Sequence, residues 1–246
     1  MKPLDRIKLT REYVRRFEQD GFLVMDRLLS HEEIDAFLAH EASRPETPDL
    51  GLRAHMVDPQ WKHLATHPNV AGIAAQLLGG PPQVVQTMYL PKKAGKGAPG
   101  IALHQDTHYL PSEPNTLMAC WIAMSDTDER NGGLCVVPGS HREELRTTHK
   151  SPPDDHHSWT QDYLMRDQAG KEWTQTFYSF EIDTQDPSTL QTLKVRKGGG
   201  VFFTGMTIHG SYVNRSDHDR LAFAVHYIRE GSWVFRADVQ DTMPTS

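Results

Sequence analysis

Hydrophobic residues recur with two different periods along this chain, and the change between them falls near residue 82. Before that point, apolar residues recur at helical spacing in TREYVRRFEQDG, SHEEIDAFLAHEA, DPQWKHLATHP and PNVAGIAAQLLGG. The second of these segments begins with a capping box, in which Ser30 is followed three residues later by Glu33. A short apolar run, FLVMD, predicts a strand between the first two helices. We therefore expect residues 1–82 to form a mostly helical support.

From residue 83 onward the apolar runs are short, rich in β-branched and aromatic residues, and separated by clusters of Gly, Pro, Asn and Asp. This pattern predicts strands joined by turns. The runs are QVVQTMYL, TLMACWIAMSD, GLCVVPG, GGGVFFTGMTIHGSYVN and RLAFAVHYI. Several strands in succession favour a β-sandwich or barrel. We expect residues 83–140 and 194–235 to supply the strands of a barrel, with the helical layer packed on it, in a single domain spanning residues 1–246.

Residues 141–193 interrupt the predicted strands. This segment is polar, contains Pro152-Pro153 and shows only weak periodicity. Long polar insertions in compact domains often form lids or binding loops, and they also occur as solvated surface excursions. The sequence is compatible with both interpretations.

Charge and composition exclude several classes of partner. The formal net charge is -6 and no run of Lys and Arg occurs, which argues against binding to nucleic acid. The start MKPLDRIKLT lacks the apolar segment of a signal peptide, and no apolar run approaches the ~18 residues that a membrane span needs. Cys120 and Cys135 lie in apolar runs outside any CxxC pattern, so we expect two buried thiols in a reducing compartment. These features predict a cytoplasmic protein that binds neither nucleic acid nor membrane.

Candidate chemistry begins in the stretch ALHQDTHYL, which places His104 and Asp106 two residues apart at the end of a predicted strand. Side chains at i and i+2 leave the same face of a strand, so both can point into the mouth of a barrel. A mononuclear iron site of the facial-triad type needs two imidazoles and one carboxylate, with the other coordination positions open. His209, in the distant apolar run VFFTGMTIHGSYVN, is the candidate for the third ligand. Taken alone it would be a hydrogen-bonded core histidine.

The strand that starts at Arg220 offers a candidate anion site. If Arg220 points inward, alternation directs Ala222, Ala224 and His226 inward as well. The two alanines leave room for a small molecule beside a guanidinium, which binds carboxylates in a bidentate manner. Ser211 shares the face of His209 and is placed to add a hydroxyl to the same anion. The alternative is an arginine exposed at the start of a strand.

The ordered set of these motifs resembles the phytanoyl-CoA dioxygenase family of Fe(II)/2-oxoglutarate oxygenases. The resemblance rests on HQDTHYLPSEPNTLMACWIAMSDTDERNGGLCVVPGSH, followed by VRKGGGVFFTGMTIHGSYVNRSDHDRLAFAVHY, and extends to DGFLVMDRLLSHEEIDAF and VQTMYLPKKAGKG. It covers nearly the whole chain. It implies a mainly β fold with α elements, namely a double-stranded β-helix (a jelly-roll, cupin-like barrel) with an N-terminal helical layer.

The resemblance also implies roles for individual residues. His104, Asp106 and His209 match the iron ligands, and Arg220 matches the residue that binds the far carboxylate of 2-oxoglutarate. The remaining expected site residues are Ser211 as a helper hydroxyl, Trp121 as an aromatic wall of the co-substrate pocket, Gln86 and Met88 on the strand before the motif, and Arg53 and His55 as polar side chains directed at the site. His108 and Tyr109 follow the metal motif directly, so they face the substrate or pack under residues 141–193.

The implied function is that of a dioxygenase dependent on Fe(II), 2-oxoglutarate and O2, which hydroxylates a small-molecule substrate and releases succinate and CO2. Halogenating relatives replace the carboxylate ligand with a small residue. Asp106 is present here, and the resemblance therefore favours hydroxylation. The alternatives are a cupin-like metal-binding protein without oxygenase activity, and a halogenase or desaturase on the same scaffold.

Overall fold

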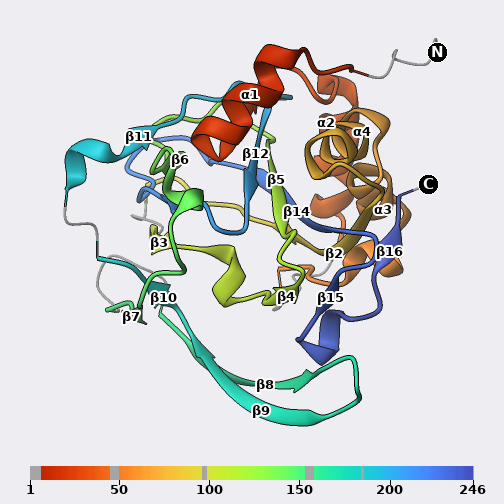
Figure 1. Ribbon diagram of the computed structural model, residues 1–246. Coiled ribbons are helices and arrows are strands. Elements are labelled where there is room, and N and C mark those ends of the chain that lie inside the picture. Colours follow the sequence, from red (N-terminus) through yellow and green to blue (C-terminus); the bar gives the residue numbers. More distant parts are fainter. Residues whose placement is uncertain (1–6, 45–49, 96–98, 153–157, 184–185, 246) are drawn as a thin grey trace.

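The computed structural model describes residues 7–44, 50–95, 99–152, 158–183 and 186–245. Figure 1 shows the helices gathered on one side of a β core, and a long hairpin that projects from the opposite side. Within these ranges no helix combines the length and apolar character required to cross a bilayer.

Four α-helices form the N-terminal layer: α1 (Arg11–Asp20), α2 (His31–Ala42), α3 (Pro59–Ala65) and α4 (Pro68–Leu78). The predicted capping box is present, since Ser30 Oγ accepts from the Glu33 backbone N–H and the Glu33 carboxylate accepts from the Ser30 backbone N–H. Helix α1 ends at Gly21, whose φ of 80° lies in the left-handed region that glycine adopts without strain. The helical interpretation of the N-terminal segments is confirmed at all four places.

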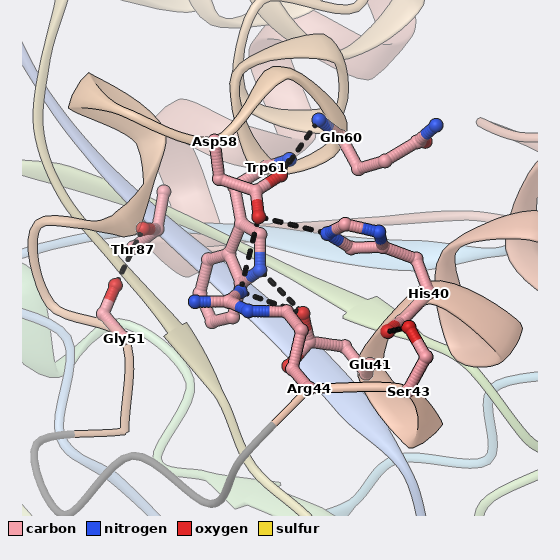
Figure 2. Close-up of polar contacts among 9 residues, drawn as sticks. All are labelled: His40, Glu41, Ser43, Arg44, Gly51, Asp58, Gln60, Trp61 and Thr87. Carbon is pink, nitrogen blue, oxygen red and sulfur yellow. Dashed lines mark hydrogen bonds and ion pairs between the residues drawn. The ribbon is translucent and has the colours of Figure 1, made fainter.

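A cluster of polar contacts ties α2 to α3 (Figure 2). His40 Nε2 lies 2.7 Å from Asp58 Oδ2, and the Asp58 Oδ1 atom accepts from the Gln60 backbone N–H at the start of α3. The Trp61 indole donates to Glu41 Oε1 at 2.6 Å, and Arg44 pairs with the same carboxylate at 2.8 Å. These bonds fix α3 against α2 and seat Trp61 over the sheet.

The larger sheet has the strand order β1 (Phe22–Met25), β12 (Gly200–Thr204), β5 (Met118–Ala123), β14 (Ala222–Arg229), β2 (Pro82–Tyr89) and β16 (Met243–Pro244), and all its pairs are antiparallel. One of its faces packs on the helices. Phe37 and Trp61 meet Phe223 edge-on there, each with a ring-centroid distance of 5.4 Å. This face, together with the helices, forms the main hydrophobic core.

The smaller sheet has the order β11 (Gln191–Thr192), β6 (Leu134–Val136), β13 (His209–Ser211) and β3 (Ile101–His104). Its side chains meet the inner face of the larger sheet, where Leu134 and Val136 join Trp121 and Ala224 in a second apolar cluster. The result is the predicted mainly β fold with an N-terminal helical layer. The two sheets are separate hydrogen-bonded units, so the described strands do not close into a barrel.

Residues 141–193 contain regular structure that the sequence pattern did not predict. Strands β8 (Thr160–Arg166) and β9 (Glu172–Tyr178) form the projecting hairpin in Figure 1. Met165 and Phe177 are its buried residues, while most of its other positions are exposed, and this explains the weak periodicity. The remaining pairs are β7 (His149–Lys150) with β10 (Phe180–Glu181) and β4 (Ser112–Glu113) with β15 (Trp233–Val234). Short 3-10 helices are η1 (Ala54–Met56), η2 (Asp106–His108), η3 (Ser140–Arg142), η4 (Pro187–Thr189) and η5 (Ala237–Val239).

The packing of the helical layer on the larger sheet predicts a large loss of stability for Phe37→Ala. The Phe37 side chain is fully buried between Trp61, Tyr89 and Phe223, so its removal leaves a cavity. We expect a loss of about 3–5 kcal/mol in the free energy of unfolding, measured by urea denaturation. Leu164→Ala, on the exposed part of the hairpin, is the control and should change it by less than about 0.5 kcal/mol. A loss below about 1 kcal/mol for Phe37→Ala would show that the helical layer does not pack as described.

Candidate active site

Strand pairing brings two of the predicted metal ligands together. His104 is the last residue of β3 and His209 is the first residue of β13, and the two are direct partners in the antiparallel register. Their ring centroids lie 4.3 Å apart. Asp106 follows His104 at the start of η2, which turns its carboxylate back toward both rings. All three side chains are buried, and their candidate ligand atoms lie within 4.8 Å of one another.

Backbone carbonyls fix the tautomer of both imidazoles. His104 Nδ1 lies 2.8 Å from the carbonyl oxygen of Ala102, and His209 Nδ1 lies 2.9 Å from that of Thr207. A carbonyl only accepts, so each Nδ1 carries the hydrogen and each Nε2 carries a lone pair. The same arrangement orients histidine ligands in metal proteins.

The Nε2 lone pairs face the carboxylate without a hydrogen between them. Asp106 Oδ1 lies 3.4 Å from His104 Nε2 and 3.7 Å from His209 Nε2. Three acceptor atoms at these distances repel one another unless a cation lies among them. Two imidazole nitrogens and one carboxylate oxygen are the donor set of mononuclear non-haem iron sites. The residues present therefore fit an Fe(II) ion.

The electrostatics keep His209 and Asp106 ready to bind a metal at neutral pH. Burial lowers the pKa of His209 to about 4, with Asp106 opposing the shift. Burial alone would raise the pKa of Asp106, but the neighbouring His209 and His226 rings hold it well below its usual range. Near pH 7 no proton has to leave these two residues before a cation binds.

Sequence reasoning placed His226 on the inward face but gave it no role. Its Nε2 donates to Asp106 Oδ2 at 3.1 Å, and its Nδ1 accepts from the Gln86 side-chain amide at 3.5 Å. The bond to Oδ2 leaves Oδ1 as the carboxylate oxygen that faces the two imidazoles. Alternation along β14 predicts that His226 faces inward. Its role could not be predicted in this way, because its partners Asp106 and Gln86 lie on other elements.

Glu33, His63 and His67 form a second group of possible metal ligands. Unlike the triad, this group has a hydrogen between its imidazole and its carboxylate. His67 Nδ1 accepts the Asn69 backbone N–H, so Nε2 carries the hydrogen and donates it to Glu33 Oε1 at 3.1 Å. Glu33 also belongs to the capping box of α2. This group is a hydrogen-bonded cap that joins two helices.

A smaller cavity beside the triad contains the predicted anion site. Arg220, Ser211 and Trp121 line it together with the three triad residues. The Arg220 side chain is 2% exposed, its Cζ lies 5.6 Å from the Trp121 ring centroid, and its Nη1 donates to the Leu90 carbonyl at 3.0 Å. Its Nε is buried without a partner, and no carboxylate among the described residues pairs with it. A buried cation left in this state is costly unless an anion binds.

Lys92 is a second buried cation, which lies behind Ser211 of the smaller cavity. Its role in the site was not predicted from the sequence. Its Nζ is buried and donates to Ser211 Oγ at 2.9 Å and to the Tyr212 carbonyl at 2.5 Å. Because Ser211 Oγ accepts from Lys92, its own hydrogen is available to a ligand in the cavity. Side chains alternate between the two faces of an extended strand, so Lys92 shares a face with Gln86 and Met88. This alternation was the pattern in the sequence that indicates the inward direction of Lys92.

A larger cavity of about 390 Å³ adjoins the smaller one at His104 and Asp106. His104 and Asp106 line both cavities, as do Met88 and His226. Two further predicted site residues, Gln86 and Tyr109, line the larger one only. Its outer wall includes Trp159 and Tyr163 from the start of the hairpin region and Phe180 of β10.

Three predicted site residues have structural positions instead. Arg53 donates to the carbonyl oxygens of Val85 and Asp241, and His55 Nδ1 lies 3.2 Å from Thr87 Oγ1. These contacts hold the segment that contains η1 against β2. Neither side chain lines either of the two cavities. His108 packs on Phe180, with ring centroids 5.0 Å apart, so its side chain lies under the insertion and not in the larger cavity. Arg53 and His55 were expected to direct polar side chains at the site, but their partners are backbone carbonyls and a buried threonine.

The sequence profile of the phytanoyl-CoA dioxygenase family (PhyH) matches residues 17–222. This chain belongs to the phytanoyl-CoA dioxygenase family. Among curated family members, the mouse phytanoyl-CoA dioxygenase domain-containing protein 1 is 31% identical over 76% of this chain and 58% of its own length. The rice phytanoyl-CoA dioxygenase 1 is 28% identical over 73% and 56%, respectively. The chain thus spans little more than half the length of these two relatives.

Solved structures support the double-stranded β-helix assignment of this family member. The non-heme alpha ketoglutarate dependent carbocyclase SnoK from nogalamycin biosynthesis aligns with a TM-score of 0.68 and 25% identity, over 95% of this chain and 89% of its own. EctD from S. alaskensis, crystallised with 2-oxoglutarate and 5-hydroxyectoine, aligns with a TM-score of 0.65 and 18% identity, over 92% and 78%. The second likeness concerns the fold alone.

The contact of His226 with Asp106 Oδ2 predicts that His226→Phe weakens metal binding. Without the donor, the carboxylate is no longer held with Oδ1 toward the imidazoles. We expect the dissociation constant for Co(II), measured by titration of its visible absorption, to rise about 10- to 100-fold.

His226→Gln is the matched control, because its amide can replace the Nε2 donor and should restore most of the affinity. Equal losses in the two variants would show that packing, and not the donated hydrogen bond, is responsible.

Proposed function

We propose that this protein is an Fe(II)- and 2-oxoglutarate-dependent dioxygenase that oxidises a C–H bond of a small-molecule substrate. One observation carries the proposal: two imidazole nitrogens and a carboxylate oxygen converge in a buried position beside a cavity lined by the buried Arg220 guanidinium, with the buried Lys92 ammonium behind Ser211. The first feature fits a ferrous ion and the second fits a small dianionic acid. Relatives that are dioxygenases, such as the ectoine dioxygenase of Bordetella parapertussis, support the assignment.

In this proposal His104 Nε2, His209 Nε2 and Asp106 Oδ1 bind the iron. Iron bound there with 2-oxoglutarate supplies the activation of O2 for C–H oxidation, with succinate and CO2 as co-products. The backbone carbonyls of Ala102 and Thr207 hold the two imidazoles, and His226 holds Asp106, so the donor set is organised before the metal arrives.

Arg220 and Ser211 orient the co-substrate by its far carboxylate. The guanidinium donates from Nε, which has no other partner, and Ser211 donates the hydrogen that Lys92 leaves unused. Trp121 covers the guanidinium and keeps water from it, which strengthens the ion pair with the bound acid.

Asp106 favours hydroxylation over halogenation as the outcome. The three protein donors that would hold the iron include the Asp106 carboxylate, whose Oδ1 faces both imidazoles. Halogenating relatives have a small residue in place of this carboxylate, so the donor set of this chain would support hydroxylation.

The direct test is addition of Fe(II) and 2-oxoglutarate without oxygen. We expect the weak visible charge-transfer band of a chelated keto acid, and succinate once oxygen is admitted. His209→Ala should abolish both signals, whereas His218→Ala, at an exposed position, should keep them. A protein that binds Fe(II) without forming the band with 2-oxoglutarate would instead be a metal-binding protein of the same fold.

Lys92 predicts a pH dependence of co-substrate binding. Burial and the neighbouring Arg220 cation lower the pKa of Lys92 to about 7. An anion binds the protonated amine more tightly, so the dissociation constant of 2-oxoglutarate should be constant below this pKa. It should rise by up to about tenfold per pH unit as the pH increases above it.

The anaerobic charge-transfer band, titrated with 2-oxoglutarate between pH 6 and pH 9, measures this dependence. Lys92→Met should weaken binding and remove the slope, and Lys93→Met, at the exposed neighbouring position, should retain it. An unchanged slope in Lys92→Met would assign the titration to another group.

A further inference from the structure

The larger cavity has an aromatic outer wall. Tyr109, Trp159, Tyr163 and Phe180 line it, and neighbouring rings are in contact: Tyr109 lies 5.9 Å from Trp159 and 4.8 Å from Phe180, centroid to centroid. Leucine, isoleucine and methionine side chains line much of the inner part. With a volume of about 390 Å³, the cavity has the size of a site for one small molecule.

The one cation among the described lining residues, apart from the histidines, is already paired. Arg236 donates from Nε and Nη2 to the two carboxylate oxygens of Asp238, at 3.1 and 2.5 Å, and its guanidinium stacks 4.1 Å from the Tyr163 ring centroid. Its Nη1 is directed at the Tyr109 carbonyl oxygen, 3.4 Å away. The pair with Asp238 and the stacking on Tyr163 fix the guanidinium between η5 and the hairpin. Because Asp238 already balances its charge, the guanidinium is not available to a substrate anion.

Three hydroxyl groups of the cavity wall form hydrogen bonds within the protein. Tyr109 Oη accepts from the Phe180 backbone N–H at 2.8 Å, Ser151 Oγ donates to the Ser179 carbonyl at 3.0 Å, and Tyr163 Oη donates to Gln161 at 3.2 Å. The one negatively charged described lining residue is Asp106, which the proposed metal neutralises. A formal charge on a ligand would therefore be buried here without a counter-ion, which is unfavourable for either sign.

We infer that the larger cavity binds an uncharged, mainly apolar ring compound and presents it to the metal site. This inference rests on the proposed function, since it names the substrate class of that same site. A flat ring system makes contact with aromatic side chains on several sides, and burial of its apolar surface supplies the affinity. The described lining has no lysine, and its arginine is paired with Asp238, so it offers no free Lys or Arg charge to the phosphates of a coenzyme A thioester or to a free carboxylate.

The test uses one framework in three charge states: biphenyl-4-methanol, biphenyl-4-carboxylate and biphenyl-4-methylammonium. Each is titrated by calorimetry, without oxygen, into the protein loaded with Fe(II) and 2-oxoglutarate. We expect the alcohol to bind about tenfold or more tightly than either ion, because each ion loses its hydration without gaining a partner. Octanoyl-CoA, titrated in the same way, should bind more weakly than the alcohol.

Three variants locate the binding. Trp159→Ala should weaken the alcohol about tenfold, as expected for loss of a large aromatic contact. Trp173→Ala, on the same hairpin but outside the cavity, should leave it unchanged. Asp238→Ala should free the Arg236 guanidinium and improve binding of the carboxylate about tenfold, which a cavity elsewhere on the protein would not show.

The outcomes separate this inference from the proposed function. Absence of the charge-transfer band before any probe is added contradicts the function. If the band forms and the carboxylate, the ammonium or octanoyl-CoA binds as tightly as the alcohol, the inferred substrate class is wrong. It is equally wrong if the alcohol does not bind up to its solubility limit.

Discussion

The site depends on one constraint: three acceptor atoms point at one another in a buried position with no hydrogen available between them. Nδ1 of His104 and of His209 is held by a backbone carbonyl two residues earlier, which commits each Nε2 to a lone pair. His226 binds the outer oxygen of Asp106 and leaves the inner one to face those lone pairs. The pairing of β3 with β13 sets the distance between the imidazoles, so the geometry is a property of the fold.

The triad borders two adjacent cavities that differ in charge. Arg220 lines the smaller one, and Lys92 lies behind its Ser211; neither cation has a carboxylate partner among the described residues. The larger one has an aromatic wall, and its Arg236 forms an ion pair with Asp238. In the proposed function, the charged co-substrate would bind in the smaller cavity and the uncharged substrate in the larger one, both beside the same metal position. This division follows from which cations the protein pairs internally and which it leaves unpaired.

Local patterns were sufficient to predict the helices and strands that support the site. Alternation along β14 predicted the inward face of Arg220, Ala222, Ala224 and His226, and the structure has Ala222 and Ala224 in the inner cluster, with Phe223 and Val225 on the helical side. The resemblance to a known family supplied the ligand set. The β8–β9 hairpin was not predictable, because both its faces are largely exposed and no alternation remains. Alternation along the strands indicates which way Lys92 and His226 face, but the roles of both residues and of Arg53 depend on partners far away in the sequence, which local patterns do not identify.

Diffraction at the iron absorption edge, from crystals grown without oxygen with Fe(II) and 2-oxoglutarate, is the most direct measurement of the central claim. The account predicts one anomalous peak within bonding distance of His104 Nε2, His209 Nε2 and Asp106 Oδ1, with the far carboxylate of 2-oxoglutarate on Arg220. An anomalous peak at Glu33 and His67 with the triad empty, or 2-oxoglutarate bound away from Arg220, would contradict it.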